Sequence, residues 1–520
     1  MKNIYLKSVL LCIMQCCVFN GSAQSGGANL FDETTHCIYI NFAQTDYWSQ
    51  LQANKAADDA NDTNTYIPAQ VIVDGQVLES VGIQFKGNSS YYNYPGNKKP
   101  FTLSFDEYID GQVCDSLKSL NLNNLYQDPS FMREKMFLDF ANEKGLNAPR
   151  ANYAKLYINN QYWGLYLMCE RIKKLFTKGR FGNSDGNLYK GDKGSSACAN
   201  LQYHGVMSPY YNCYELTNNT STNDWTDLVN LTYQIYNPTD AQFNSSVSAV
   251  LNTQSFIGAW AAYNLFCDFD SYPYRYTHNY YTYHNSATDK FEWIIWDVST
   301  AFGLDIPGTI SSIENQSVLY ITPDVNYRPL VKRMLENTEF RNTYLQTICS
   351  YSSNDFLPSV LNPKIDALHT RIQADVYADN LKMYSNANFE DNINTTTSIN
   401  GYDVIGLKSF ISNRSATVTA ELNSLGYTNC PLPLGTANNL TASAISIYPN
   451  PAGNYFTINS TTSQTGLHLS IYDLQGKIFH RQALPAENNN LVQVDGLVAG
   501  MYFIKLENTS EVKYFKLIKQ

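Results

Sequence analysis

The sequence has no long basic run and carries more acid than base. Its 46 aspartates and glutamates exceed its 36 lysines and arginines, so the 520 residues have a formal net charge of −10. Nucleic-acid binding requires clustered positive charge to meet the phosphates. The composition therefore argues against a nucleic-acid partner, and any other anion must be met by a few individual lysines.

Long hydrophobic runs are also missing, except at the N-terminus, where the run is too short to cross a bilayer. Lys2 and Lys7 precede this apolar run at 8–19, and small residues follow it at 21–23. This order is typical of a secretory signal peptide, which we expect to span 1–23 and to be cut after Ala23. No later run reaches that length without a charge. We therefore expect export and no membrane-spanning segment in the mature chain.

Cysteine pairs with metal-ligand spacing are absent as well. Of the 11 cysteines, Cys12, Cys16 and Cys17 fall within the predicted signal peptide, and the rest are scattered without a CxxC pair. This scatter argues against a structural zinc site. Cys198 and Cys213 could close a loop disulfide after export, and buried free thiols are an equally good interpretation.

The domain organisation follows from length and local composition. The chain is long for a single core, which predicts two or more domains. A proline-rich stretch at 430–435 marks a boundary. Before it, helical and strand patterns mix over 30–425, which predicts an α+β domain. After a linker at 426–444, short alternating strands fill 445–520 and predict a small all-β, immunoglobulin-like sandwich.

Hydrophobic periodicity predicts the main elements of the larger domain. A helix is expected where Asp128 and Pro129 supply a cap and a first turn, and Gly145 would close it. The predicted strands are 37–42, 66–73, 76–85, 101–105, 154–158, 163–168, 187–190, 280–283 and 291–298, and the other helices are 48–54, 253–267, 330–336, 340–350, 365–380 and 405–422.

Three oxygen-bearing side chains stand out in an aromatic-rich stretch. Asp270 and Asn279 are followed by Asp297, which ends a predicted strand. An acid, an amide and a second acid is the order in which protein kinases place their base and magnesium ligands. Carboxylate and amide oxygens suit a hard cation that holds phosphate oxygens. Asp and Asn also populate turns, so this order needs support from the rest of the chain.

Three further blocks of the sequence give that support. The first block is Val81-Gly-Ile-Gln-Phe-Lys-Gly-Asn-Ser-Ser90, followed by Lys98-Lys99-Pro-Phe. The second block contains Met132-Arg-Glu-Lys135, the segment from Leu156 to Glu170, and Leu188-Tyr-Lys190. The third block contains Trp296-Asp297 and Phe302-Gly303. With the Asp270 stretch, these blocks make residues 38–422 resemble the CotH kinase family. The resemblance implies a divergent, two-lobed, protein-kinase-like domain that binds ATP with Mg²⁺ or Mn²⁺. It also implies phosphorylation of Ser or Thr in secreted proteins.

The resemblance assigns roles residue by residue. Asp270 matches the catalytic acid of the family, Asp297 matches its metal-binding acid, and Asn279 fits the amide ligand between them. The sequence departs from the family at two places. Lys86 stands where an Arg usually precedes the glycine, and Ser299 replaces the second acid of a Trp-Asp-x-Asp motif. Either departure could weaken metal binding or mark a member without activity.

Further candidates for nucleotide binding come from the same blocks. Lys190 could reach the ATP phosphates as a point charge, and Glu170 could pair with such a lysine or bind metal. The loop from Lys86 through Ser89 and Ser90 could lay backbone N–H groups against phosphate. Alternatively, Lys190 is a surface charge, Glu170 forms an ion pair in a turn, and the loop from Lys86 to Ser90 is an ordinary hairpin loop.

Four other residues of these blocks have structural interpretations that involve no catalysis. Lys98 and Lys99 could equally form a solvated face. Arg133, on the predicted capped helix, could contact the site, but a surface ion pair is the expected role. His278, beside Asn279, is expected to pack in an aromatic cluster rather than act as a base.

The C-terminal region resembles a second family, the type A sorting domain of the type IX secretion system. Ile447-Tyr-Pro-Asn-Pro-Ala452, Ile471-Tyr-Asp-Leu-Gln-Gly476, the segment 497–505 and the terminal Lys519 carry the resemblance. It implies passage through the type IX machinery and release or attachment at the outer cell surface. The competing function is a catalytically inactive surface adhesin or coat scaffold. The 40 tyrosines suit such a surface role.

Overall fold

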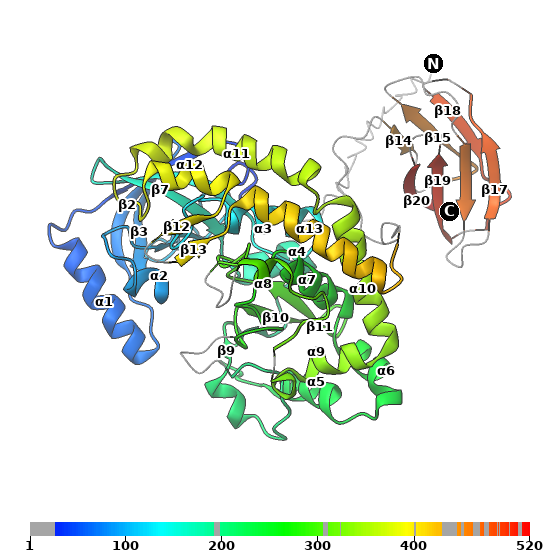
Figure 1. The fold of residues 1–520 in the computed structure, drawn as a ribbon, viewed down its shortest axis with the longest axis horizontal. Helices are drawn as coiled ribbons and strands as arrows, with labels where there is room; N and C mark the ends of the chain where they lie inside the picture. The colour runs from blue at the N-terminus through cyan, green and yellow to red at the C-terminus, as the bar shows by residue number, and fades with distance from the viewer. Residues whose placement is uncertain are drawn as a thin grey trace, which may run out of the picture. The chain divides into compact units, whose positions relative to one another are not determined.

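The computed structural model contains two compact units, residues 1–437 and 438–520 (Figure 1). In the first unit the structure describes residues 26–191, 198–304, 310–322, 324–399 and 402–428. In the second it describes 445–448, 452–460, 468–472, 478–485, 487, 489–498, 500–507 and 512–519. The predicted signal peptide and nearly all of the predicted linker lie outside the described residues, so both stay predictions.

The N-terminal half of the first unit is a closed barrel with the strand order β1-β2-β3-β4-β5-β7-β6. Alternation builds its core. In β2, for example, Ile67, Val71 and Val73 are buried while Pro68 is exposed. The strands are β1 (His36–Asn41), β2 (Ile67–Val73), β3 (Gln76–Phe85), β4 (Phe101–Ser104), β5 (Ser119–Asn123), β6 (Ala151–Ile158) and β7 (Gln161–Glu170).

The second half of the unit packs helices around a sheet with the order β11-β10-β8-β9. The sheet strands are β8 (Leu188–Lys190), β9 (Glu215–Leu216), β10 (Tyr280–Asn285) and β11 (Lys290–Ile295), and a separate hairpin joins β12 (Thr397–Ile399) to β13 (Tyr402–Val404). Helix α7 (Thr253–Leu265) is buried along most of its length and packs against β11 and α10 (Thr338–Asn354). This burial on every side explains why α7 is apolar rather than amphipathic.

The remaining helices lie around these two parts and between them (Figure 1). They are α1 (Tyr47–Asn61), α2 (Ser89–Tyr92), α3 (Arg133–Glu143), α4 (Lys174–Phe181), α5 (Thr226–Tyr236), α6 (Asp240–Val250), α8 (Ile310–Glu314), α9 (Pro329–Glu336), α11 (Pro358–Ala378), α12 (Asn386–Asn394) and α13 (Leu407–Ser424), with short 3₁₀ turns at Ser208–Asn212 and Val325–Tyr327. Among the described residues, no helix combines the length and apolar character needed to cross a membrane.

Several predicted boundaries need correction. Helix α3 begins at Arg133 rather than at Asp128, although the Asp128 carboxylate still accepts a hydrogen bond from the Arg133 N–H at 2.9 Å. Helix α1 continues to Asn61. Helices α5 and α6 were not predicted.

Arg133, which was expected at the surface, and Lys98, for which a solvated face was one interpretation, are both buried. Arg133 is 0% exposed, where its guanidinium pairs with Asp128 and donates to Asn392 and the Ile405 carbonyl. Lys98 is also 0% exposed and donates to Asp379 at 2.6 Å. The prediction of a surface ion pair for Arg133 is therefore wrong, as is the solvated interpretation of Lys98.

The cysteines divide between both interpretations offered above. Cys198 and Cys213 form a disulfide across a sequence separation of 15 residues. Cys114, Cys169 and Cys267 are buried free thiols.

The second unit is all-β. The described strands form a three-stranded sheet, β14-β15-β18, and a four-stranded sheet, β17-β16-β19-β20, both antiparallel. They share a core that includes Phe456, Ile471 and Ile504. The strands are β14 (Ile445–Tyr448), β15 (Tyr455–Ser460), β16 (His468–Tyr472), β17 (Ile478–Ala483), β18 (Asn489–Gln493), β19 (Gly500–Glu507) and β20 (Val512–Lys519). The mixed α+β class and the all-β C-terminal region are confirmed, and an immunoglobulin-like topology stays a prediction.

Candidate active site

Three strands of the smaller sheet bring candidate residues to one edge. Lys190 at the end of β8 pairs with Tyr281, near the start of β10. Tyr280, the first residue of β10, pairs with Ile295, the last residue of β11. Asn279 directly precedes β10, and Asp297 follows β11 by two residues. The topology therefore places Lys190, Asn279 and Asp297 along the same edge of the sheet.

Asp270 and Asn279 form one hydrogen-bonded turn. The Asn279 side-chain amide donates to the Asp270 carbonyl at 2.8 Å and to its carboxylate at 3.2 Å. These two bonds use the Nδ2 group of Asn279 and hold the side chain against Asp270. His278 Nε2 lies 3.0 Å from the other Asp270 carboxylate oxygen. The His278 ring also lies against Tyr276, with ring centroids 5.3 Å apart, so it packs on an aromatic ring and orients Asp270 as well.

Asp297 is an exposed carboxylate in an unusual backbone conformation. Its φ is +47°, and the φ of Asn279 is +60°. Asp and Asn adopt this left-handed region more readily than other non-glycine residues, which fits their use at both positions. The Ser299 hydroxyl donates to Asp297 Oδ1 at 2.9 Å. The serine that replaces a second acid thus occupies one oxygen of the remaining carboxylate.

Lys86 connects the barrel to this edge of the sheet. It follows β3, and its ammonium donates to Asn123 Oδ1 at 2.7 Å and lies 5.6 Å from the centre of the Trp296 ring. Burial lowers the pKa of the Lys86 ammonium, and the negative charges of Asp297 and Glu134 oppose that shift. Lys86 therefore lies within electrostatic reach of the acid on the sheet edge.

Glu134 is the acid that the barrel and α3 place beside Lys86. The Asn123 amide bridges the two residues, because it accepts from Lys86 and donates to both Glu134 carboxylate oxygens at 2.9 and 3.1 Å. Burial and the negative charge of Asp297 raise the pKa of the Glu134 carboxyl to about 7, against the opposing charge of Lys86. Glu134 thus changes charge near neutral pH.

Asp268 lies two residues before Asp270, and the two acids differ in access to solvent. Asp268 is fully buried, and its Oδ1 accepts from the Thr300 hydroxyl at 2.6 Å. Its Oδ2 has no hydrogen-bond partner among the described residues. Burial raises the pKa of Asp268 well above its usual range, and the charges of Asp270 and Asp297 add to the rise. The side chain of Asp270 is 29% exposed, so it is the acid that an acceptor can reach.

Glu170 has arginine partners instead of the lysine considered above. The carboxylate, at the end of β7, accepts from Arg150 at 2.8 Å and from Arg180 at 3.2 Å. Burial alone would raise the pKa of Glu170, but the hydrogen bonds and charges of these arginines outweigh it and lower the pKa. This pairing fixes the segment where the chain leaves the barrel.

The loop after Lys86 makes a tight turn. Gly87 has a φ of +81°, and a Cβ at this position would lie 2.3 Å from the Ser90 hydroxyl oxygen. The Asn124 side-chain amide donates to the Ser90 carbonyl at 2.9 Å and so holds the end of the loop in place. Ser89 opens the single-turn helix α2 and is exposed. Glycine is therefore required for the loop to close, and Ser89 faces solvent beside Lys86.

The donor set fits a hard cation held jointly with a nucleotide. Within the described parts of the chain, no group of three His, Cys, Asp or Glu side chains is arranged to hold a metal alone. Mg²⁺ is usually bound by one or two protein oxygens together with substrate phosphates and water. Asp297 has an exposed carboxylate and Asn279 an amide oxygen at the same end of the sheet, so the types of oxygen that these residues carry fit a shared Mg²⁺ or Mn²⁺.

The sequence analysis missed Asn123 and Glu134 as members of the site. Glu134 stands in the Met132–Lys135 block, and an acid early in a helix could have been considered as a partner for Lys86. Asn123 gives no signal of its own, because its role exists only once β5 lies beside the end of β3.

Comparison with known proteins identifies both parts of the chain. Residues 83–418 match the family model described as CotH kinase protein, and residues 446–520 match the one described as secretion system C-terminal sorting domain. Inner spore coat protein H of Bacillus subtilis (strain 168) is 27% identical over 319 residues, which cover 61% of this chain and 83% of that protein. Invasin CotH3 of Rhizopus delemar is 21% identical over 446 residues, which cover 79% of this chain and 70% of that protein.

A search of solved structures pairs the chain with the crystal structure of a Helicobacter pylori proinflammatory kinase, CtkA. The pair is 12% identical over 68% of this chain and 95% of that chain, with a TM-score of 0.26. This score is too low to carry an argument about the fold. The family matches stand without it, because the first of them spans more than half of the residues. The chain belongs to the CotH kinase family and ends in a type IX secretion sorting domain.

Proposed function

We propose that this protein is an atypical protein kinase that transfers the γ-phosphate of ATP to Ser or Thr of exported proteins. The observation that carries the proposal is the register of the small sheet, which supports a site with Asn279 and Asp297 at the same end of their strands. Asn279 is bonded to Asp270, and the charge of Asp297 acts on Lys86 and Glu134. The barrel and the helix-rich part would act as the two lobes of a kinase-like domain. Family membership supports the same reading.

In this proposal Asp297 and Asn279 hold Mg²⁺ or Mn²⁺ together with the phosphates of ATP. The cation would spread the negative charge that develops during phosphoryl transfer. The hydrogen bond from Asn279 to Asp270 fixes the direction of the amide oxygen. Ser299 keeps one Asp297 oxygen occupied and so orients the carboxylate.

Asp270 would orient the acceptor hydroxyl and take its proton. The acceptor oxygen forms a bond to the γ-phosphorus as the bond from phosphorus to the ADP oxygen breaks, and the hydroxyl proton passes to the Asp270 carboxylate. His278 Nε2, 3.0 Å from Asp270, holds that carboxylate in place. A positioned base of this kind contributes roughly 10²–10⁴-fold to the rate.

The cations of the site would bind the nucleotide tail. Lys86 is held by Asn123 and balanced by Glu134, an arrangement like the lysine–glutamate pair of protein kinases. Lys190, at the sheet edge, would add a second charge, and the Gly87–Ser90 loop would supply backbone N–H groups. Glu170 is left out of this set because arginines hold it.

The C-terminal domain suggests where the reaction takes place. A type IX sorting domain supports secretion to the cell surface. The acceptors would then be proteins of the same compartment, either during export or at the surface.

A second candidate function is an inactive surface adhesin. Two observations favour it: Ser299 replaces an acid beside Asp297, and the relative from Rhizopus delemar is named an invasin. Binding of a host or coat surface needs no metal and no Asp297 carboxylate, so one substitution separates the two functions.

The deciding experiment is Asp297→Asn in the full chain. We expect phosphate transfer to fall by about 10²–10³-fold, because one electrostatic catalytic group is removed while the backbone conformation is kept. Asp289→Asn is the matched control, since Asp289 also has positive φ, lies on the same hairpin and is exposed. Transfer would be measured by mass spectrometry of phosphosites with ATP and each metal. A wild-type protein that neither binds metal-ATP nor transfers phosphate would refute the kinase and leave the adhesin.

A further inference from the structure

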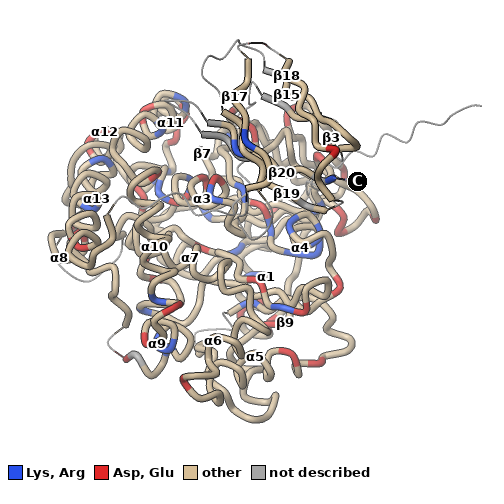
Figure 2. Tube along the Cα trace, turned by 90° about the vertical axis from the view of Figure 1, so that its right-hand side faces the viewer, with Lys and Arg blue, Asp and Glu red and all other residues tan. Residues whose placement is uncertain are grey.

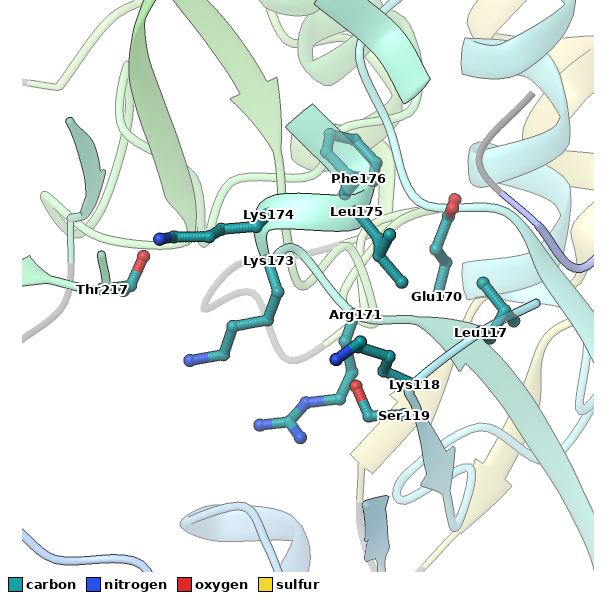
Figure 3. A pocket seen from close by; sticks show the side chains of 10 residues that line it. All are labelled: Leu117, Lys118, Ser119, Glu170, Arg171, Lys173, Lys174, Leu175, Phe176 and Thr217. Atoms are coloured by element: carbon teal, nitrogen blue, oxygen red, sulfur yellow. The ribbon is translucent and has the colours of Figure 1, made fainter. Parts of the chain in front are cut away.

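A basic pocket lies where the chain passes from β7 into α4 (Figure 3). It has a volume of 270 Å³, and its lining includes Lys118, Arg171, Lys173, Lys174, Leu175 and Phe176. The tips of Arg171, Lys173 and Lys174 point to one side of the chain, and the Glu170 carboxylate points away from them. Figure 2 shows the same grouping of Lys and Arg at α4.

These cations lack acidic partners inside the described structure. No ion pair within 4.0 Å involves Arg171, Lys173 or Lys174 there, whereas Lys118 at the rim pairs with Asp106 at 2.6 Å. Glu170, the acid in the lining, is already bound by two arginines outside the pocket, Arg150 and Arg180. Because the protein has a net charge of −10, a local cluster of positive charge attracts anions at this place in particular.

The pocket is electrostatically continuous with the candidate active site. Reduced hydration and the positive charges of Arg171 and Lys190 lower the pKa of Lys173, while Glu215 opposes the shift. The charge of Arg171 also acts on Lys86. Mutual repulsion of this kind costs stability and is relieved when an anion binds. The cations that line the pocket therefore favour binding of an anionic group there.

The size of the pocket limits what that group can be. Sites for nucleotides and other drug-sized ligands usually have volumes of about 300–1,000 Å³, so 270 Å³ suits a smaller group. A single phosphate or carboxylate with a short stem fits, and Leu175 and Phe176 offer an apolar wall for the stem. The nucleotide tail already has Lys86 and the sheet edge in the proposed function.

We propose that the basic pocket binds an acidic or phosphorylated side chain of the protein substrate. This inference rests on the proposed kinase function and adds a substrate class to it. An acceptor Ser or Thr would be selected when a phosphoserine, phosphothreonine, Asp or Glu lies nearby in the same substrate. Phosphate is the better ligand of the two, because Arg and Lys can meet three acceptor oxygens at once.

The test measures binding of short fluorescent peptides to the full chain without nucleotide. Three peptides differ at one position only, which is phosphoserine, Glu or Ala. We expect the phosphoserine peptide to bind about tenfold more tightly than the Ala peptide. Arg171→Ala/Lys173→Ala should abolish this preference. Lys178→Ala is the matched control, because Lys178 is exposed on the same helix but does not line the pocket, and it should bind like wild type.

The outcomes separate the alternatives. Tighter binding of both anionic peptides assigns acidic substrates, and tighter binding of the phosphopeptide alone assigns substrates that are already phosphorylated. Equal binding of all three peptides overturns the inference. The inference is also overturned if Mg²⁺-ATP displaces the phosphopeptide and the double variant no longer binds ATP. In that case the pocket is part of the nucleotide-binding site. Asp297→Asn should keep peptide binding while losing transfer, so failure of the kinase proposal is seen separately.

Discussion

At the scale of single residues, the site depends on side chains whose charge is set by their neighbours. Lys86, Glu134 and Asp297 come from three different parts of the chain, and each shifts the titration of another. Asp297 also holds a positive φ, which most residues adopt only at a cost of about 1–2 kcal/mol. Asn is therefore a better probe than Ala at this position, because it removes the charge without adding backbone strain.

The raised pKa of Glu134 predicts that stability falls as pH rises. Its carboxyl has a pKa of about 7 when folded, against 4.5 for the free group. Between these values the folded state holds more protons than the unfolded state, so unfolding becomes easier with increasing pH. Glu134→Gln removes this dependence. From pH 5 to pH 8, the variant should gain roughly 2–3 kcal/mol in unfolding free energy relative to wild type.

Denaturant titrations followed by tryptophan fluorescence would measure this difference. All six tryptophans lie in the first unit, so the signal reports that unit alone. Asp297→Asn is an internal check, because the Asp297 charge raises the Glu134 pKa, and the pH slope should become shallower in this variant. Parallel curves for wild type and Glu134→Gln would contradict the prediction.

How far the sequence could predict the site depends on how local each contact is. Asp270 and Asn279 are nine positions apart in one turn, and their order alone suggested a shared role. Glu134 and Asn123 belong to the site because β3, β5 and α3 meet, and no local pattern encodes that meeting. Glu170 was considered as a partner of a lysine or of a metal, with a turn ion pair as the alternative. The structure pairs it with Arg150, next to β6, and with Arg180 on α4.

At the scale of elements, a buried ion pair fastens the barrel to the helices. Asp379, just after α11, accepts from Lys98 at 2.6 Å and from the Leu165 N–H at 3.1 Å. Both charged residues are 0% exposed. A Cβ on Gly164 would lie 2.4 Å from the Asp379 carboxylate, so only glycine leaves room for it. Helix α11 is thereby held against β7.

Breaking this pair should be costly. Lys98→Met leaves the Asp379 charge buried without its cation, which predicts a loss of about 3–5 kcal/mol in unfolding free energy. The matched control is Lys364→Met, since Lys364 on α11 pairs with Glu143 at the surface, and exposed pairs contribute at most about 1 kcal/mol. Tryptophan-detected denaturation would compare the two variants. Equal effects would show that burial of the Lys98 pair has no special weight.

The elements differ in how well their patterns predicted them. The hairpin of β2 and β3 was predicted within a residue or two, because one buried face gives strict alternation. Helix α3 begins late because Asp128 and Ser130 form a hydrogen-bonded turn before it. That turn places Arg133 in the core, where Asn392 and the Ile405 carbonyl complete its contacts. Those partners are more than 250 positions away, so no local reading could have predicted the burial.

At the scale of the whole molecule, the chain forms two compact units that do not share a hydrophobic core among the described residues. The first unit combines a barrel and helices, and the second has a separate all-β core around Phe456, Ile471 and Ile504. The sequence analysis placed a boundary near 430–435, because a proline-rich segment cannot continue either pattern, and the two compact units meet at residues 437 and 438.

Separate cores predict separate unfolding. Calorimetry of the full chain should show two transitions, and tryptophan fluorescence should follow only one of them, because every tryptophan lies before residue 438. Truncation after Ala437 should remove the other transition and move the tryptophan-detected midpoint by less than about 2 °C, a shift below about 1 kcal/mol for a unit of this size. Phosphate transfer should persist in the truncated chain, while export through the type IX machinery should be lost because the sorting domain is gone. A single calorimetric transition, or a midpoint that falls by more than about 5 °C, would show that the second unit stabilises the first and that the two cores do not fold independently.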